Sequence, residues 1–265
     1  MERRYLLPGE TPEELFTRVA HHIASCNDST DQEAAYYEAM SSLKFLPNSP
    51  TLMNAGTGQG TLSACFVLPL EDTMEGIMDT AKSAAMVQKF GGGTGFSLSK
   101  LRPKSAPIST THGKACGPVA VLKHLSSVSK LVTQGGKRDG ANMAVLHVSH
   151  PDIMEFITCK QDEGDIHNFN ISVGVDNKFM DAVRHDSLYP LRDPASKTTT
   201  ATVRARVIWN AIIDNAWHNG EPGIIFLDTV NKQHIKLGLG EITATNPCGE
   251  QPLPPNESCN LGSID

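Results

Sequence analysis

The chain has 265 residues, of which 39% are hydrophobic and 20% charged, and a formal net charge of −6 at pH 7. These values are typical of a globular protein with a sizeable core, either one α/β barrel or two ordinary domains. They argue against a nucleic-acid surface, which needs clustered Lys and Arg, and no run of about 18 apolar residues offers a membrane span. Because the N-terminus lacks the apolar core of a signal peptide, we expect the protein in the cytoplasm.

The N-terminal part of the chain predicts two helices. Residues 11–25 begin with a T-x-x-E capping box at Thr11, and apolar residues then recur at helical spacing. A second helix is expected at 31–43. The next segment, 45–56, carries two prolines and ends in Asn-Ala-Gly, so we interpret it as a shaped loop.

From residue 63 on, short apolar strands alternate with helical stretches. Strands are expected at 63–70, 94–99, 143–149, 168–175 and 222–228. Helices are expected between them, at 73–90, 119–134, 151–162 and 203–219. The end of the chain is expected to be irregular. Alternation of helices with apolar strands indicates a parallel sheet or a barrel.

Glycine loops and a histidine pair in this region do not by themselves indicate a ligand site. The run GGGTG at 91–95 lacks the G-x-G-x-x-G spacing, and the loops at 113–115 and 136–138 lack the Ser or Thr of a P-loop. Taken alone, they predict tight turns. His147 and His150 lie at a strand-to-helix junction, and we expect no metal there.

The six cysteines are scattered, without C-x-x-C or zinc-ribbon spacing. Most buried cysteines act as small hydrophobes, so any chemical role needs local context. That context is present at 244–264, where Asn246, Cys248 and Glu250 alternate. On an extended segment the amide, thiol and carboxylate point to one side. Such a set suits chemistry better than a hydrophobic core.

Six motifs, which run from about residue 5 to the last residue, carry a family resemblance: FLPNSPTLMNAG, LSACFVLPLEDTMEGI, GGGTGFSLSKLRP, GGKRDGANMAVLHVSHPDI, NFNISV and NPCGEQPLPPNESCNLGSI. Together they resemble the ribonucleotide reductases, most closely the adenosylcobalamin-dependent class. The resemblance implies an α/β fold, the N-terminal half of a ten-stranded α/β barrel at 46–265, preceded by a small helical segment at 1–45. It also implies that the C-terminal half of the barrel is missing from this chain.

The resemblance assigns catalytic roles to five residues. Cys248 takes the place of the thiyl radical, which abstracts hydrogen from the ribose 3′ carbon. Asn246 is the hydrogen-bond donor, and Glu250 the acid/base that takes the 3′-hydroxyl proton while the 2′-hydroxyl leaves as water. Cys65 and Cys259 supply two electrons and close to a disulfide.

The resemblance also implies nucleotide-binding residues. Those expected to hold the substrate are Ser49, Thr51, Ala64 and Gly93. Those expected to hold a dNTP effector are Asp72, Lys100, Arg102 and Arg138, the last in the loop at 135–142. Two simpler interpretations stay open at this point: Lys100 and Arg102 as solvated charges, and Asp72 as a helix N-cap before Thr73.

The cofactor implied is adenosylcobalamin. The partners implied are a ribonucleoside di- or triphosphate, a dNTP effector, thioredoxin or a similar dithiol, and a second copy of the chain in a homodimer. One alternative is the large subunit of the class that takes its radical from a separate metal-containing small subunit; the compact spacing from Cys248 to Cys259 favours cobalamin. Another alternative is an inert, dNTP-binding fragment that needs a partner chain. At Cys116 the family motif usually has serine, which we interpret as a neutral exchange.

Overall fold

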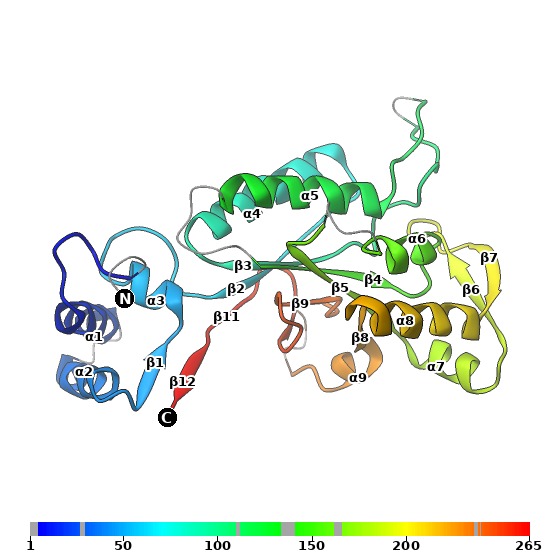
Figure 1. Ribbon diagram of the computed structural model, residues 1–265. Helices are drawn as coiled ribbons and strands as arrows, with labels where there is room; N and C mark the ends of the chain where they lie inside the picture. The colour runs from blue at the N-terminus through cyan, green and yellow to red at the C-terminus, as the bar shows by residue number, and fades with distance from the viewer. Residues whose placement is uncertain are drawn as a thin grey trace.

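The computed structural model describes residues 5–26, 30–109, 112–133, 141–161, 166–235, 238 and 240–265. A small, mostly helical N-terminal part lies beside a larger part built on one sheet (Figure 1). Among the described residues, no helix is long and apolar enough to cross a membrane.

The N-terminal part contains α1 (Pro12–Cys26), a short 3-10 turn (Thr30–Gln32) and α2 (Glu33–Ser41). The predicted capping box is confirmed: the Glu14 N–H donates to Thr11 Oγ1 at 3.2 Å, and the Thr11 N–H donates to Glu14 Oε2 at 2.8 Å. These two bonds satisfy backbone donors that the first turn of a helix leaves free.

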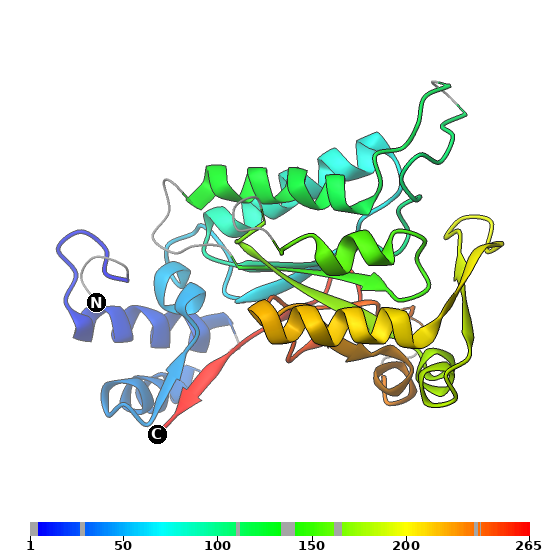
Figure 2. The ribbon, with the colours of Figure 1, turned by 45° about the vertical axis from the view of Figure 1, so that its right-hand side comes forward.

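The predicted loop at 45–56 is wrong, because the segment forms β1 (Phe45–Pro47) and α3 (Ser49–Asn54). The side chain of Asn48 accepts the Thr51 N–H and so caps α3, whose first turn tolerates a proline. Strand β1 has its partner at the other end of the chain, where β12 (Gly262–Ile264) pairs with it antiparallel (Figure 2). Tertiary pairing therefore orders a segment whose local sequence is typical of a loop.

The larger part is built on a six-stranded sheet in the order β11-β2-β3-β4-β5-β8. Five strands run parallel, and β11 is antiparallel to β2. Their bounds are β2 (Cys65–Leu68), β3 (Gly93–Ser97), β4 (Asn142–His147), β5 (Phe169–Val175), β8 (Gly223–Phe226) and β11 (Ser258–Cys259). The predicted parallel sheet is confirmed, and its central strands are buried on both faces, as apolar runs require.

Helices cover one face of this sheet: α4 (Met74–Lys89), α5 (Pro118–Thr133), α6 (Ile153–Thr158), α7 (Asn177–Arg184) and α8 (Ala205–Asn219). Ala144 and Leu146 of β4 belong to the core cluster that these helices complete. Helix α7 and the hairpin of β6 (Leu188–Arg192) and β7 (Thr199–Arg204) were not predicted, nor was α9 (Leu227–Lys232). In Figure 1, α4 and α5 lie above the sheet, with β9 below it.

The opposite face of the sheet carries a short hairpin, β9 (Ala244–Thr245) and β10 (Pro252–Leu253). Met143 and Val145 of β4 point to this side and pack with Ala244 and Leu253. Alternate residues of one strand thus serve two cores, because successive side chains of a strand point to opposite faces. The hairpin places Asn246 and Pro247 against the sheet, next to Cys65 and Gly93.

Candidate active site at the hairpin tip

The tip of the β9–β10 hairpin is a closed turn. The Gly249 N–H donates to the Asn246 carbonyl at 3.1 Å, and Gly249 has a φ of +86°, a conformation that favours glycine. The Asn246 N–H donates to the Gln251 carbonyl at 3.0 Å. The predicted extended alternation of Asn246, Cys248 and Glu250 is therefore wrong.

The turn still brings the three functional groups together. Asn246 is fully buried, whereas Cys248 and Glu250 are exposed. The Asn246 side-chain amide donates to Glu250 Oε1 at 2.6 Å and lies 3.9 Å from the sulfur of Cys65. Its own oxygen accepts the Gln251 N–H at 3.0 Å. Asn246 is thus the buried link between the exposed carboxylate and a cysteine of the sheet.

Two glycines of β3 make room for the hairpin. A Cβ on Gly95 would lie 1.8 Å from the Thr245 carbonyl oxygen, and one on Gly93 would lie 2.5 Å from the Pro247 ring. No side chain fits at Gly95. The run GGGTG, interpreted above as a tight turn, therefore in part forms the surface on which the hairpin packs.

Asn170 of β5 is an anchor of the hairpin that sequence reasoning missed. Its side chain donates to the Pro247 carbonyl at 2.8 Å. The sequence does offer an indication of this role, because Asn170 is a polar residue between the apolar residues of the strand NFNISV.

The two other predicted cysteines lie directly opposite each other. Cys65 begins β2 and pairs in register with Cys259 of β11, and the Ala64 N–H donates to the Cys259 carbonyl at 3.0 Å. Both are free thiols. Residues that are far apart in the sequence thus become cross-strand neighbours, close enough for their side chains to interact.

Burial keeps both of these thiols protonated. Burial, together with the adjoining thiols of Cys259 and Cys248 and against the opposing effect of the Asn246 amide, raises the pKa of Cys65 to about 12. Burial also raises the pKa of Cys259, against the opposing hydrogen bond with Cys65 and with smaller contributions from Glu250 and Cys248. The three cysteines and the carboxylate therefore form one electrostatically coupled cluster.

Residues 63–265 match the family model described as the ribonucleotide reductase barrel domain, and residues 1–60 match the ribonucleotide reductase all-alpha domain. The chain belongs to the ribonucleotide reductase family.

Named relatives in this family include B12-dependent enzymes. The chain is 53% identical over 231 residues to a vitamin B12-dependent ribonucleoside-diphosphate reductase of Thermoplasma acidophilum, covering 87% of the chain and 30% of the relative. It is 44% identical over 278 residues to an enzyme of the same name from Mycobacterium tuberculosis, covering 100% of the chain and 40% of the relative. It is 32% identical over 301 residues to a ribonucleoside-diphosphate reductase large subunit of Variola virus, covering 100% of the chain and 39% of the relative. The chain spans between 30% and 40% of the length of these reductases.

Of the four residues that the ribonucleotide reductase resemblance assigns to substrate, two lie in α3 and two lie next to the cysteine cluster. Thr51 is buried and its hydroxyl contacts Asn48 and the Leu62 carbonyl, while the Ser49 hydroxyl lies 3.1 Å from that of Tyr5. Ala64 directly precedes Cys65. Gly93 lies under Pro247. Their contacts with a substrate stay predictions.

The residues assigned to the effector lie at the other end of β2. Arg102 donates to Asp72 through its backbone N–H at 3.1 Å and through Nε at 2.6 Å, whereas Lys100 pairs with Glu71 at 3.2 Å. The interpretation of Asp72 as an N-cap is wrong, because Thr73 caps α4 by accepting the Gly76 N–H. Arg138 lies outside the described residues.

A hollow of about 810 Å³ opens at the carboxyl ends of the parallel strands. Ser97 and Thr243 line it, whereas the cysteine cluster lies near Gly93 and Pro247, at the other end of the hairpin. It is therefore separate from the cysteine cluster.

His147 and His150 line this hollow too, and both already have hydrogen-bond partners within the chain. His150 bonds the Leu101 carbonyl at 2.8 Å, and His147 the Ser149 hydroxyl at 2.7 Å. Burial lowers the pKa of both imidazoles.

Proposed function

We propose that this chain supplies the radical cysteine and the redox cysteine pair of a ribonucleotide reductase that uses adenosylcobalamin. The observation that carries the proposal is the convergence of three thiols, one amide and one carboxylate at the hairpin tip. The packing of the sheet does not require Cys248 or Glu250, since both side chains are exposed. The vitamin B12-dependent names of two relatives support the choice of cofactor.

The proposed chemistry uses each group for a step that suits its surroundings. The Cys248 thiyl radical takes hydrogen from the ribose 3′ carbon, and Glu250 accepts the 3′-hydroxyl proton as the 2′-hydroxyl leaves as water. Cys65 and Cys259 together give up two protons and two electrons and form one S–S bond. Burial raises the pKa of both residues, which favours the thiol over the thiolate before that step.

Asn246 acts in this proposal as a positioning group. Its 2.6 Å hydrogen bond uses Glu250 Oε1, which leaves Oε2 for the substrate hydroxyl. Because Asn246 is fully buried and bonded on both sides of its amide, it holds the carboxylate in one orientation.

The turn leaves the Cys248 thiol accessible to a radical donor. Cys248 is exposed at the turn, whereas Asn246 behind it is buried. Adenosylcobalamin, when bound, supplies the one-electron chemistry that oxidises the Cys248 thiol. The chain's own contribution is to hold that thiol on a fixed turn beside the carboxylate and the cysteine pair.

We further propose that the five parallel strands are half of a ten-stranded barrel. The helices on one face and the hairpin on the other support this, because a barrel has a helical outside and an inside that holds the active site. The segment 1–45 would then pack as a separate helical part.

We propose that the chain forms a homodimer and that a dNTP effector binds near the dimer interface. Helices α4 and α5 expose the apolar side chains Met74, Met78, Met86 and Leu131. Asp72 lies where β2 leads into α4, and it forms an ion pair with Arg102, which follows β3. We expect the Asp72 carboxylate to accept the deoxyribose hydroxyl, with Arg102 and Lys100 facing the phosphates.

The test of this function is an anaerobic assay on a reductase that contains this segment, with ribonucleotide, dithiol and dNTP. We expect turnover only when adenosylcobalamin is added. Turnover that needs a metal-containing small subunit in place of the cofactor would favour the alternative class, to which the viral relative's name points. Binding of dNTP without turnover under any condition would favour the inert fragment.

A further inference from the structure

Helix α3 contacts the chain segment that leads into Cys65. The hydroxyl of Thr51 donates to the Leu62 carbonyl at 2.9 Å. The side chain of Asn54 donates to the Thr61 carbonyl at 2.8 Å. Two residues of one short helix thus hold the backbone just before β2.

The same helix contacts the segment that follows Cys259. The Asn48 N–H donates to the Leu261 carbonyl at 2.9 Å, and its side chain lies 3.5 Å from that of Asn260. Asn48 is buried, and its side-chain oxygen is also in contact with the N–H and the hydroxyl of Thr51. The contacts to the two cysteine segments are therefore joined through one Asn48–Thr51 pair.

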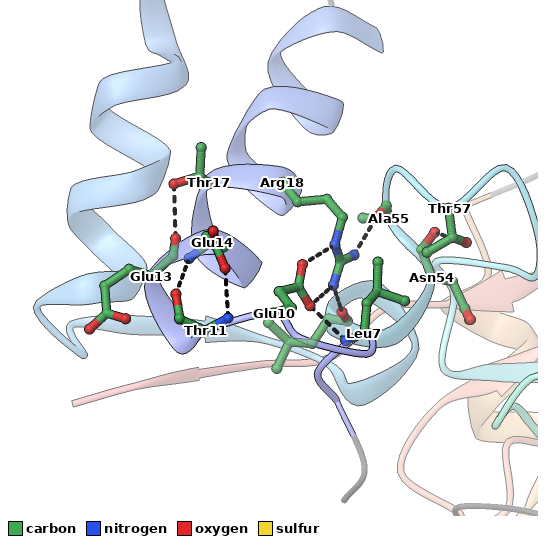
Figure 3. Close-up of polar contacts among 11 residues, drawn as sticks. Leu7, Glu10, Thr11, Glu13, Glu14, Thr17, Arg18, Asn54, Ala55 and Thr57 are labelled. Carbon is green, nitrogen blue, oxygen red and sulfur yellow. Dashed lines mark hydrogen bonds and ion pairs between the residues drawn. The ribbon is translucent and has the colours of Figure 1, made fainter. Parts of the chain in front are cut away.

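The far end of α3 is anchored to α1 (Figure 3). Arg18 donates to the Ala55 carbonyl and, at 3.3 Å, to the Leu52 carbonyl, and it pairs with Glu10 at 2.7 Å. The guanidinium of Arg18 lowers the pKa of Glu10. A mostly buried cation at the last carbonyls of a helix is favourable, so α3 is fixed at both ends.

The strand that carries Cys259 is short and lies at the edge of the sheet. Its ladder with β2 comprises Ser258 and Cys259, and backbone hydrogen bonds of Asn256 and Glu257 with Val67 extend the contact before Cys259. After Cys259, Asn260 and Leu261 contact Asn48 of the α3 N-cap. A short edge ladder depends on such packing from elsewhere.

We propose that α3, through Asn48, Thr51 and Asn54, positions Cys65 and Cys259 for disulfide formation. The proposal rests on the redox role that the proposed function gives to these cysteines. In the reaction, the two thiols release two protons and two electrons to an oxidant as one S–S bond forms. By holding both segments, α3 raises the effective concentration of one thiol at the other.

The test equilibrates the 265-residue chain with mixtures of reduced and oxidised glutathione. Oxidised glutathione accepts the two electrons and becomes two molecules of the reduced form. After acid quenching, peptide mapping measures the fraction of chain with a disulfide between Cys65 and Cys259. We expect Thr51→Val to lower the equilibrium constant for this disulfide roughly fivefold, the usual effect of one lost hydrogen bond. Asn54→Ala, which removes a separate contact, gives a second measurement if Thr51→Val does not fold.

Three controls separate positioning from general stability. Thr17→Val removes an exposed α1 hydroxyl that bonds the Glu13 carbonyl (Figure 3) and should leave the constant unchanged, as should Ile208→Val in the core of α8. Thr51→Ser should restore the native value. If the equilibrium constant is unchanged in both α3 variants, the positioning role of α3 is overturned but the redox pair is not. The same conclusion follows if Ile208→Val lowers the constant as much as Thr51→Val does. A native chain that never forms this disulfide overturns the pair as well.

Discussion

The side-chain amide of Asn246 donates a 2.6 Å hydrogen bond to the carboxylate of Glu250, across a turn that leaves the amide buried and the carboxylate exposed. The bond joins a fixed donor to an exposed carboxylate. It orients Glu250 without removing it from the surface that a substrate would meet. The first prediction follows from this geometry.

Asn246→Asp should lower kcat by roughly 100-fold or more in a reductase that contains this segment, because general acid–base catalysis typically contributes that much. The variant keeps the size of the side chain and the oxygen that accepts the Gln251 N–H, but it places a second carboxylate against Glu250. Steady-state kinetics measure the effect. Asn219→Asp, at an exposed site, is the matched control. Full activity in the Asn246 variant would contradict the positioning role.

Cys248→Ser should reduce turnover to below about 1%, since loss of an essential radical carrier removes several kcal/mol of barrier lowering. The O–H bond of serine is too strong to serve the same radical. The control is Cys116→Ser, another exposed cysteine, which should keep activity. Turnover and the thermal unfolding midpoint are measured on both variants. Substantial activity in the Cys248 variant would exclude the radical assignment.

Gly95→Ala should displace the hairpin from the sheet, because the new Cβ would lie 1.8 Å from the Thr245 carbonyl oxygen. We expect a loss of about 1–3 kcal/mol in the free energy of unfolding, as for other overpacked sites. Urea denaturation measures it, and alkylation of the Cys248 thiol reports on the position of the turn. Asn170→Ala removes only the anchor to Pro247 and should have a smaller effect. If Gly95→Ala keeps native stability and a native alkylation rate, the close contact of the hairpin with Gly95 is contradicted.

Cys65 should resist alkylation by iodoacetamide at pH 8 in the folded chain. With its pKa raised from 9.0 to about 12, its thiolate fraction is roughly a thousandfold smaller than that of an ordinary thiol. Because the folded chain holds this proton more tightly than the unfolded chain, ionisation of Cys65 does not affect stability below pH 9 and lowers it as the pH rises from 9 toward 12. Mass spectrometry of isotope-labelled peptides gives the rate, and the same chain in denaturant is the control. Equal rates in both states would show that burial does not protect Cys65.

Asp72→Ala should blunt the change in substrate preference that different dNTPs cause, with basal turnover largely kept. The carboxylate of Asp72 is held by Arg102 and is partly exposed, so it can accept a ribose hydroxyl. Competition assays with two ribonucleotides and several dNTPs measure the preference. Glu71→Gln, which affects the neighbouring exposed pair with Lys100, should respond normally. If Asp72→Ala also responds normally, the effector binds elsewhere.

The sequence alone was sufficient for features that depend on local chemistry and on ordered motifs. Apolar runs alternating with helical spacing predicted the parallel sheet, and the capping box at Thr11 formed as its residue types require. The order of the motifs indicated the family and singled out Cys248, Cys65 and Cys259. These inferences depend only on residues that are close in the sequence, or on the order of family motifs along it.

The tertiary structure alone decided how those residues meet. Local propensity could not show that β1 pairs with β12, and so 45–56 was expected to be a loop. Nor could it show that Asn246 and Glu250 meet across a turn, because the alternation suits a strand equally well. The role of Gly95 depends on a hairpin from much later in the sequence. The opposition of Cys65 and Cys259 likewise comes from sheet pairing, since contacts between distant segments depend on how the whole core packs.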